Sequence, residues 1–226
     1  MLRPLDQGSI DFTLRTKESD DVNPNQDSLQ IINQATATLA KIGDLEVADL
    51  IIEGQEIKNN INTDLDLAVA ARYFDDDNIA VGTGPLPPVV GQKTTFRIYW
   101  SLANSLNPVS DVVVSTILPA GVQWENKFLA KTGTMSYSSK DNKVSWTINN
   151  ITANKNFEDI NVWFDIGVIP TASQERKLII LTDQTELIAT DSVNDAEIYK
   201  TGKATTSNLE DDPIGGGRGL VIDLSE

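Results

Sequence analysis

The amino-acid sequence predicts an all-β protein with an antiparallel sandwich or barrel architecture. Three observations support this class. Apolar and polar residues alternate with period two in several short segments, as in half-buried strands. Proline, glycine and asparagine separate these segments at intervals of roughly 8–12 residues, which is typical of sandwiches and barrels. All four tryptophans lie between positions 100 and 163, so we place the main core there.

The strands with the clearest alternation fall in the middle of the chain. In Phe96–Leu102 the even positions are apolar and point to one side, whereas Arg97 and Tyr99 point to the other. We predict four strands in this region, and a turn at Leu118–Gly121 separates the second strand from the third. Eight residues of these strands are expected to face inward. The four strands are Phe96–Leu102, Val112–Leu118, Lys143–Ile148 and Ile160–Ile166. The inward-facing residues are Phe96, Ile98, Trp100, Val112, Val114, Trp146, Val162 and Phe164.

Composition excludes several classes of function. The formal net charge of -15, with a pI of about 4.3, repels a phosphate backbone, so we expect no nucleic-acid partner. The chain contains neither cysteine nor histidine, which excludes disulfides, thiolate or imidazole metal ligands and Ser-His-Asp catalysis. The acidic residues occupy turns and outward strand positions and form no aromatic-lined carboxylate pair of the glycosidase type. We therefore expect no enzyme.

The chain also repeats itself at an offset of about 150 residues. Three segments match later segments in order, at offsets of 150, 150 and 148. The matched pairs are Ile10–Leu14 with Ile160–Phe164, Leu29–Ala40 with Ile179–Thr190, and Asp49–Gln55 with Glu197–Lys203. The first copy has no counterpart of residues 96–148. The repeat therefore predicts the C-terminal half of one module followed by one complete module.

The repeat divides the chain into three parts. Residues 1–63 are the predicted half-module, residues 64–212 the complete module, and residues 213–226 a flexible tail that ends in a short strand, Leu220–Ile222. The half-module is expected to contain the strands Ile10–Thr16, Leu29–Ala40 and Val47–Glu53. A sandwich that lacks half of its strands leaves an apolar face and open edges, which invites pairing with another chain. The half-module could receive strands from a neighbouring subunit, fold back against the complete module, or have its missing strands upstream in a longer protein. We favour the last of these expectations, with completion by another subunit second.

The complete module resembles the bacterial conserved-repeat domain known as domain of unknown function eleven. The resemblance rests on a Val-Gly start with a Thr-rich strand, an asparagine that ends this strand, a valine-rich strand and a Leu-Pro-x-Gly-Val turn. These are Val90–Phe96, Asn104, Asp111–Val114 and Leu118–Val122. The resemblance covers about residues 88–170 and implies an immunoglobulin-like sandwich. It also implies tandem arrays in bacterial surface, adhesin or surface-layer proteins, without catalytic residues.

The resemblance implies a non-catalytic spacer in an extracellular or cell-surface repeat protein that supports adhesion or filament assembly. Its partners would be neighbouring modules or subunits. Residues 1–4 open no apolar run, so we expect any export signal to lie outside this sequence. The alternative is a carbohydrate- or protein-binding accessory module, because Tyr99, Tyr137 and Trp124 could stack on sugars. For Trp124, a cap on the core is the other interpretation. Lys93 is a candidate for an isopeptide bond with a late-strand asparagine.

Calcium is the only cofactor that the sequence suggests. Carboxylate and amide oxygens alternate along one turn, as at the start of a calcium-binding loop, although the glycine and the final acid of such a loop are missing. Other acid runs lie near the expected module ends, at Asp75–Asp77 and Glu210–Asp212. An exposed, solvated turn is the alternative for both. The candidate ligands are Asp21, Asn23, Asn25, Asp27, Asp75, Asp76 and Asp77.

Overall fold

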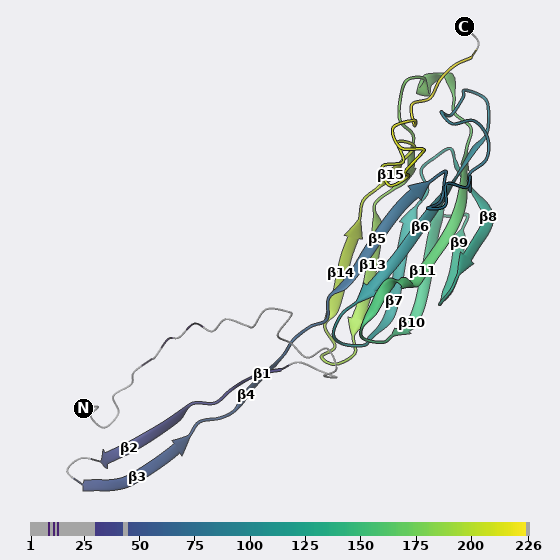
Figure 1. The fold of residues 1–226 in the computed structure, drawn as a ribbon. Coiled ribbons are helices and arrows are strands. Elements are labelled where there is room, and N and C mark those ends of the chain that lie inside the picture. Colours follow the sequence, from purple (N-terminus) through teal and green to yellow (C-terminus); the bar gives the residue numbers. More distant parts are fainter. Residues whose placement is uncertain (1–8, 10, 12, 14–29, 43–44, 225–226) are drawn as a thin grey trace.

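The computed structural model describes residues 9, 11, 13, 30–42 and 45–224, and they form an all-β fold (Figure 1). The predicted strands in the middle of the chain are confirmed. The strands before the sandwich are β1 (Gln30–Asn33), β2 (Thr36–Ile42), β3 (Leu45–Glu53) and β4 (Ile57–Asn60). Those of the sandwich are β5 (Leu65–Arg72), β6 (Thr94–Asn104), β7 (Val109–Ile117), β8 (Val122–Ala130), β9 (Thr134–Ser138), β10 (Lys143–Ile151) and β11 (Lys155–Val168). A short 3₁₀ turn (Ala172–Gln174) then leads to β12 (Ile180–Thr182), β13 (Thr185–Asp191), β14 (Glu197–Gly202) and β15 (Thr205–Thr206).

Two antiparallel sheets face each other and make the predicted sandwich. One sheet has the order β14-β13-β7-β10-β9, and the other has the order β5-β6-β11-β8. Consecutive strands repeatedly change sheet, so the core is built from residues that are distant in the sequence. Strands β12 and β15 form a separate two-stranded ladder at the end of the sandwich that holds the C-terminal segment (Figure 1).

The core is the one that the alternation predicts. All eight residues that we expected to face inward are at most 1% exposed and belong to one contiguous cluster. Trp100 and Phe164, from the neighbouring strands β6 and β11, pack edge to face with ring centroids 5.0 Å apart. Each large apolar side chain buried in this way contributes about 1.5–3 kcal/mol. Burial of these apolar side chains is therefore the main source of stability of the sandwich.

The glycine-rich segment after residue 212 is part of the sandwich, so the prediction of a flexible tail is wrong for residues 213–224. Val221 is fully buried in the core, and Ile222 forms a parallel bridge with Val89. Gly219 lies so close to the carbonyl oxygen of Ser207 that an added Cβ would be 1.9 Å from it. The glycines therefore allow tight packing here, and the sandwich extends at least to Ile222.

Strands β1–β4 form an arm of paired strands that extends from the sandwich, at the end opposite the C-terminal segment (Figure 1). The predicted strand Leu29–Ala40 is observed as two strands, interrupted at Gln34–Ala35, and the predicted strand Val47–Glu53 lies within β3. The predicted strand Ile10–Thr16 falls outside the described residues. In the part of the chain that the structure describes, no helix is long and apolar enough to cross a membrane.

Candidate functional site

Two buried aspartates fasten the two ends of the sandwich, and we treat these clamps as the candidate functional site. The first, Asp191, lies at the end of β13, where the arm joins the sandwich. It is fully buried, and its Oδ2 accepts hydrogen bonds from the backbone N–H of Thr63 at 2.8 Å and from Nδ2 of Asn107 at 2.9 Å. Its other oxygen accepts the N–H of Val193 at 2.9 Å. Asp191 thus fixes the point at which the chain enters β5.

Further side chains complete this entry clamp. Thr63 Oγ1 donates to Oδ1 of Asn104 at 2.8 Å, and Asn107 donates to the carbonyl oxygen of Ile61 at 2.9 Å. Asn104 and Asn107 are both buried, and Asn104 Nδ2 also bonds to the carbonyl oxygen of Asn107. Buried polar groups need such partners, because an unsatisfied one costs about 1–3 kcal/mol. Asn104 is the strand-ending asparagine of the resemblance described above, and here it anchors the residues before β5.

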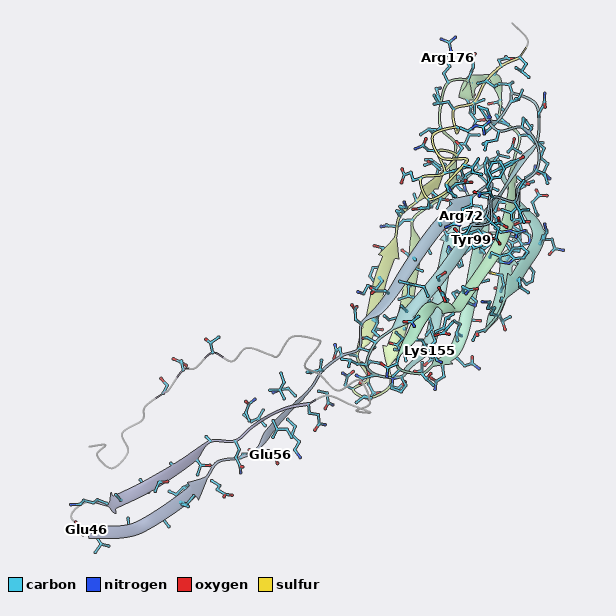
Figure 2. All side chains as sticks on the ribbon, viewed as in Figure 1. Glu46, Glu56, Arg72, Tyr99, Lys155 and Arg176 are labelled. Carbon is cyan, nitrogen blue, oxygen red and sulfur yellow. The ribbon has the colours of Figure 1, made fainter. Side chains whose placement is uncertain are left out.

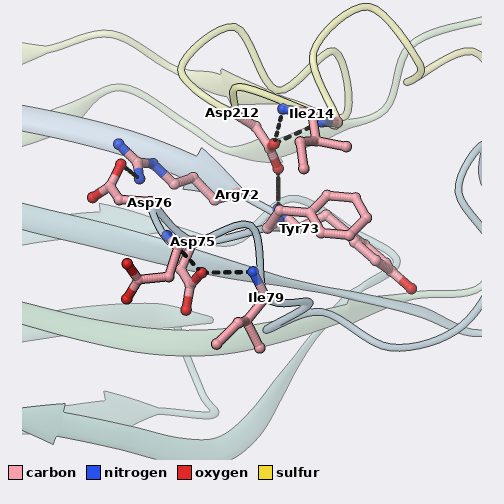
Figure 3. A network of polar contacts seen from close by, with 10 residues as sticks. Arg72, Tyr73, Asp75, Asp76, Ile79, Asp212 and Ile214 are labelled. Atoms are coloured by element: carbon pink, nitrogen blue, oxygen red, sulfur yellow. Dashed lines mark hydrogen bonds and ion pairs between the residues drawn. The ribbon is translucent and has the colours of Figure 1, made fainter.

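The second clamp, Asp212, lies where β5 ends, away from the arm, and Figure 3 shows its contacts. One carboxylate oxygen accepts the N–H groups of Tyr73 and Phe74 at 2.7 and 2.8 Å, and the other accepts those of Ile214 and Gly215 at 2.9 and 2.6 Å. Burial alone would raise the pKa of Asp212, but these four N–H donors hold its pKa below the ordinary value. Asp212 therefore ties the C-terminal segment to the loop that follows β5.

The C-terminal segment is also bonded to the sandwich by its backbone. Ile222 donates to the carbonyl oxygen of Pro88 at 2.9 Å and accepts from the N–H of Val90 at 3.0 Å. Val221 exchanges backbone hydrogen bonds with Arg176 and Lys177, at 2.8 and 3.1 Å. The chain therefore enters the sandwich at one end through the Asp191 clamp and leaves it at the other through these bonds.

The predicted calcium ligands at Asp75–Asp77 do not converge. Oδ1 of Asp75 accepts the N–H groups of Asp77 and Ile79, closing a turn, while Asp76 pairs with Arg72 (Figure 3). Among the described residues, no group of three or more acidic side chains is arranged to hold a metal ion. Glu210 and Asp211 pair instead with Lys203. The candidates Asp21, Asn23, Asn25 and Asp27 lie outside the described residues, and calcium binding there stays a prediction.

The three aromatic residues proposed for sugar stacking do not form a row. Trp124 and Tyr137 stack on each other with ring centroids 5.4 Å apart and an interplanar angle of 11°. Trp124 also contacts Phe164 of the core at 5.4 Å. It therefore covers the edge between the two sheets, in agreement with the interpretation of Trp124 as a cap.

Tyr99 lies on the outer face of the four-stranded sheet, directly opposite Trp163 in the β6–β11 ladder. Arg72 lies over the ring of Tyr99 at 5.7 Å, and Arg97 lies over Trp163 at 3.5 Å. Arg72 and Tyr99 are labelled in Figure 2. Burial raises the pKa of Tyr99. The guanidinium groups thus occupy positions where a sugar would stack.

In the described part of the chain, the hydrogen-bond and ion-pair partners of Lys93 include a carboxylate but no asparagine side chain. Its Nζ lies 2.7 Å from Oε1 of Glu125 on β8. Isopeptide formation would require an asparagine or aspartate side chain at this amine, so the geometry does not favour that bond.

Sequence reasoning did not identify Asp191 or Asp212 as clamps. For Asp191 a signal exists, because residues 185, 187 and 189 are inward-facing positions of β13 and position 191 continues their phase. An acid at an inward position needs buried partners. Asp212 lacks such a signal, because its four donors come from two segments about 140 residues apart.

No family model and no curated protein match the chain. Solved structures of three major pilins are among those similar to it. BcpA, the major pilin subunit of Bacillus cereus, shares 10% identity with a TM-score of 0.43, over 82% of this chain and 66% of the pilin. The major pilin SpaD of Corynebacterium diphtheriae shares 12% with a TM-score of 0.37, over 66% of this chain and 35% of the pilin. A C-terminal fragment of the major pilin GBS80 of Streptococcus agalactiae shares 11% with a TM-score of 0.38, over 72% and 56%.

Proposed function

We propose that this chain is a non-catalytic, load-bearing spacer of an extracellular or cell-surface repeat protein, one that supports adhesion or the assembly of filaments or surface layers. One observation carries the proposal: the chain enters and leaves the sandwich at opposite ends of its long axis (Figure 1), and each end is fastened by a buried carboxylate. Modules strung end to end require this arrangement, because tension then passes along the sandwich. Neighbouring modules or subunits of the same protein are its proposed partners.

The first strand is placed so that tension loads it along its length. β5 pairs with β6 through eight consecutive residue pairs, from Leu65 opposite Asn104 to Arg72 opposite Arg97. It starts at the arm end and runs towards the end where the C-terminal segment leaves (Figure 1). Pulling the two chain ends apart therefore shears the whole ladder at once, and its hydrogen bonds must yield together. This geometry supports a mechanical role.

Single-molecule force measurements test the proposal. Because the sequence contains no cysteine, two introduced cysteines define the pulling points without interference. With attachment at Asn62 and Leu224, β5 is loaded in shear. With attachment at Asn62 and Ser105, the same strand is unzipped from β6 one pair at a time. We expect a clearly higher rupture force in the first geometry, and equal or lower forces would contradict a load-bearing role.

A further inference from the structure

The pairing in the arm repeats the pairing of the last hairpin of the sandwich. In β2 and β3, Ala37 lies opposite Ile52 and Leu39 opposite Leu50. At the offsets of 150 and 148 found in the sequence, these become the pairs Leu187–Lys200 and Ala189–Ile198, and both are paired in β13 and β14. The flanking strands also pair in both places, β1 with β4 and β12 with β15, but in different registers: Ile32 lies opposite Lys58, whereas Thr182 lies opposite Thr205. Sequence offsets do not impose a hairpin register, so the agreement of β2–β3 with β13–β14 is independent support for the repeat.

The repeat also equates the faces of the two hairpins. Residues directly opposite each other in an antiparallel pair project to the same side. Ala37, Leu39, Leu50 and Ile52 therefore share one face of the arm, which we call the arm's apolar face. Its counterparts in β13 and β14 include Leu187, which is fully buried in the core. In the arm, Leu50 and Ile52 are 45% and 49% exposed. The opposite face carries Thr36, Thr38, Ile51 and Glu53.

A glycine also occupies equivalent positions in the two hairpins. Gly202, which pairs with Thr185, admits Val69 of β5, because an added Cβ would lie 2.5 Å from Val69 Cγ2. Its counterpart is Gly54, whose N–H donates to the carbonyl oxygen of Ala35 at 2.7 Å. The three atoms nearest to a Cβ built on Gly54 all belong to Ala35, at 3.0–3.8 Å. The nearest contacts at Gly54 therefore come from the arm itself, whereas those at Gly202 come from β5 of the sandwich.

We propose that the arm is the terminal hairpin of a second immunoglobulin-like module, and that its apolar face docks onto an incomplete sandwich that lacks its own terminal hairpin. Such a partner supplies strands equivalent to β5–β10 and offers β2 an edge like that of β7. The molecule itself displays the docked form, because β13 pairs with β7 and places Leu187 opposite Val114. A two-stranded hairpin alone is marginally stable in water, so docking stabilises the arm.

Transplanting the arm into the sandwich tests this equivalence. In one variant of the full chain, residues 35–39 replace residues 185–189 and residues 50–53 replace residues 198–201. In the matched control, residues 36–40 and 49–52 take the same places. This one-residue slip keeps the cross-strand pairs but exchanges the two faces. Gly202 and the turn 190–197 are unchanged in both variants.

We expect the in-register variant to unfold cooperatively, with the tryptophan emission of the unaltered chain, and the slipped variant to lose this transition. Folding of both variants, or of the slipped variant alone, would overturn the equivalence. If neither variant folds, a second measurement, which leaves β13 and β14 intact, tests the proposal.

The second measurement uses an extended chain in which a copy of residues 64–159 precedes residue 10, because residue 10 corresponds to residue 160. The added segment supplies strands equivalent to β5–β10 next to the arm. We expect hydrogen exchange at the β2 and β3 amides to become at least about 100-fold slower than in residues 1–226. Leu39→Asp should abolish this slowing, whereas Thr38→Asp on the opposite face should retain it. Unchanged exchange in the extended chain would overturn the proposal.

Hydrogen exchange in the unextended chain tests whether a different occupant covers the arm's apolar face. If its arm amides already exchange slowly, and the slowing increases with protein concentration, a second copy covers the apolar face and the proposed partner is wrong. Slow exchange in a monomer, independent of concentration, would contradict an undocked arm altogether. Fast exchange at all concentrations is the result that we expect.

Discussion

The hairpins β2–β3 and β13–β14 have the same register but opposite surroundings. Around β13–β14, inward residues such as Leu187 are buried between two sheets, and outward residues such as Tyr199 are exposed. In β2–β3, both Leu50 on one face and Ile51 on the other are exposed, at 45% and 59%. Alternation therefore specifies which face of a hairpin is apolar, whereas burial depends on strands elsewhere in the chain or in a partner.

The two hairpins also differ in how they are anchored. Strand β13 ends at Asp191, which three hydrogen-bond donors surround. At an offset of 150 its counterpart is Lys41, which forms an ion pair with Glu46 at 3.2 Å while both side chains are more than half exposed. A buried carboxylate and a surface lysine thus occupy equivalent positions. Only the docked hairpin takes part in fastening a chain end.

The largest difference between the hairpins is expected for a leucine truncation. Leu187→Ala should lower the free energy of unfolding by about 2–5 kcal/mol, because it leaves a cavity in the core. The same substitution on the arm's apolar face, Leu39→Ala, should alter it by less than about 0.5 kcal/mol. Chemical denaturation followed by tryptophan fluorescence measures both, since all four tryptophans lie in the sandwich. A comparable loss for Leu39→Ala would mean that the arm packs against the sandwich.

Removal of the entry clamp should have the next largest effect. Asp191→Ala leaves the donors of Thr63, Asn107 and Val193 without this acceptor and should cost about 2–4 kcal/mol. The exposed Asp183, which lies before β13, serves as the control and should change stability by less than about 0.5 kcal/mol on substitution by alanine. Urea denaturation gives both values. If Asp191→Ala were as mild as the control, Asp191 would not be a clamp.

At the other end of the sandwich, Asp212→Asn should lower the free energy of unfolding by about 1–3 kcal/mol at neutral pH. The folded-state pKa of Asp212 lies below its ordinary value of 3.8, so its charged form is favoured in the folded protein. This stabilisation is complete above the unfolded-state pKa and is lost as the pH falls through the folded-state pKa. The difference between the two proteins should therefore shrink below about pH 4. A difference that is constant with pH would exclude this mechanism.

The smallest effects are expected at exposed ion pairs, where the two regions should behave alike. Lys203→Gln removes the pairs with Glu210 and Asp211, and Lys41→Gln removes the pair with Glu46. Each change should cost less than about 1 kcal/mol, and the cost should decrease as salt is added. Melting curves at low and high ionic strength test this. A large, salt-independent loss for Lys203→Gln would show that this pair fastens the C-terminal segment.

The sequence alone determined the period and phase of the strands. Phe96, Trp100 and Phe164 could be assigned to the core because neighbouring side chains of a strand point to opposite sides, whatever the strand pairs with. The offset of the repeat also followed from the sequence, and the same offset relates the pairs of β2–β3 to those of β13–β14. These properties are local, or depend on comparing one segment with another.

Which side chains meet became clear from the tertiary structure alone. Asp212 binds N–H groups of residues about 140 positions away, and Asp75 closes its own turn instead of joining a cation site. The glycines after residue 212 suggested a flexible linker, yet Gly219 packs against Ser207. A glycine allows both a mobile chain and close packing, and an aspartate suits both water and a ring of N–H donors. Which of these occurs depends on the groups that the fold places next to the residue.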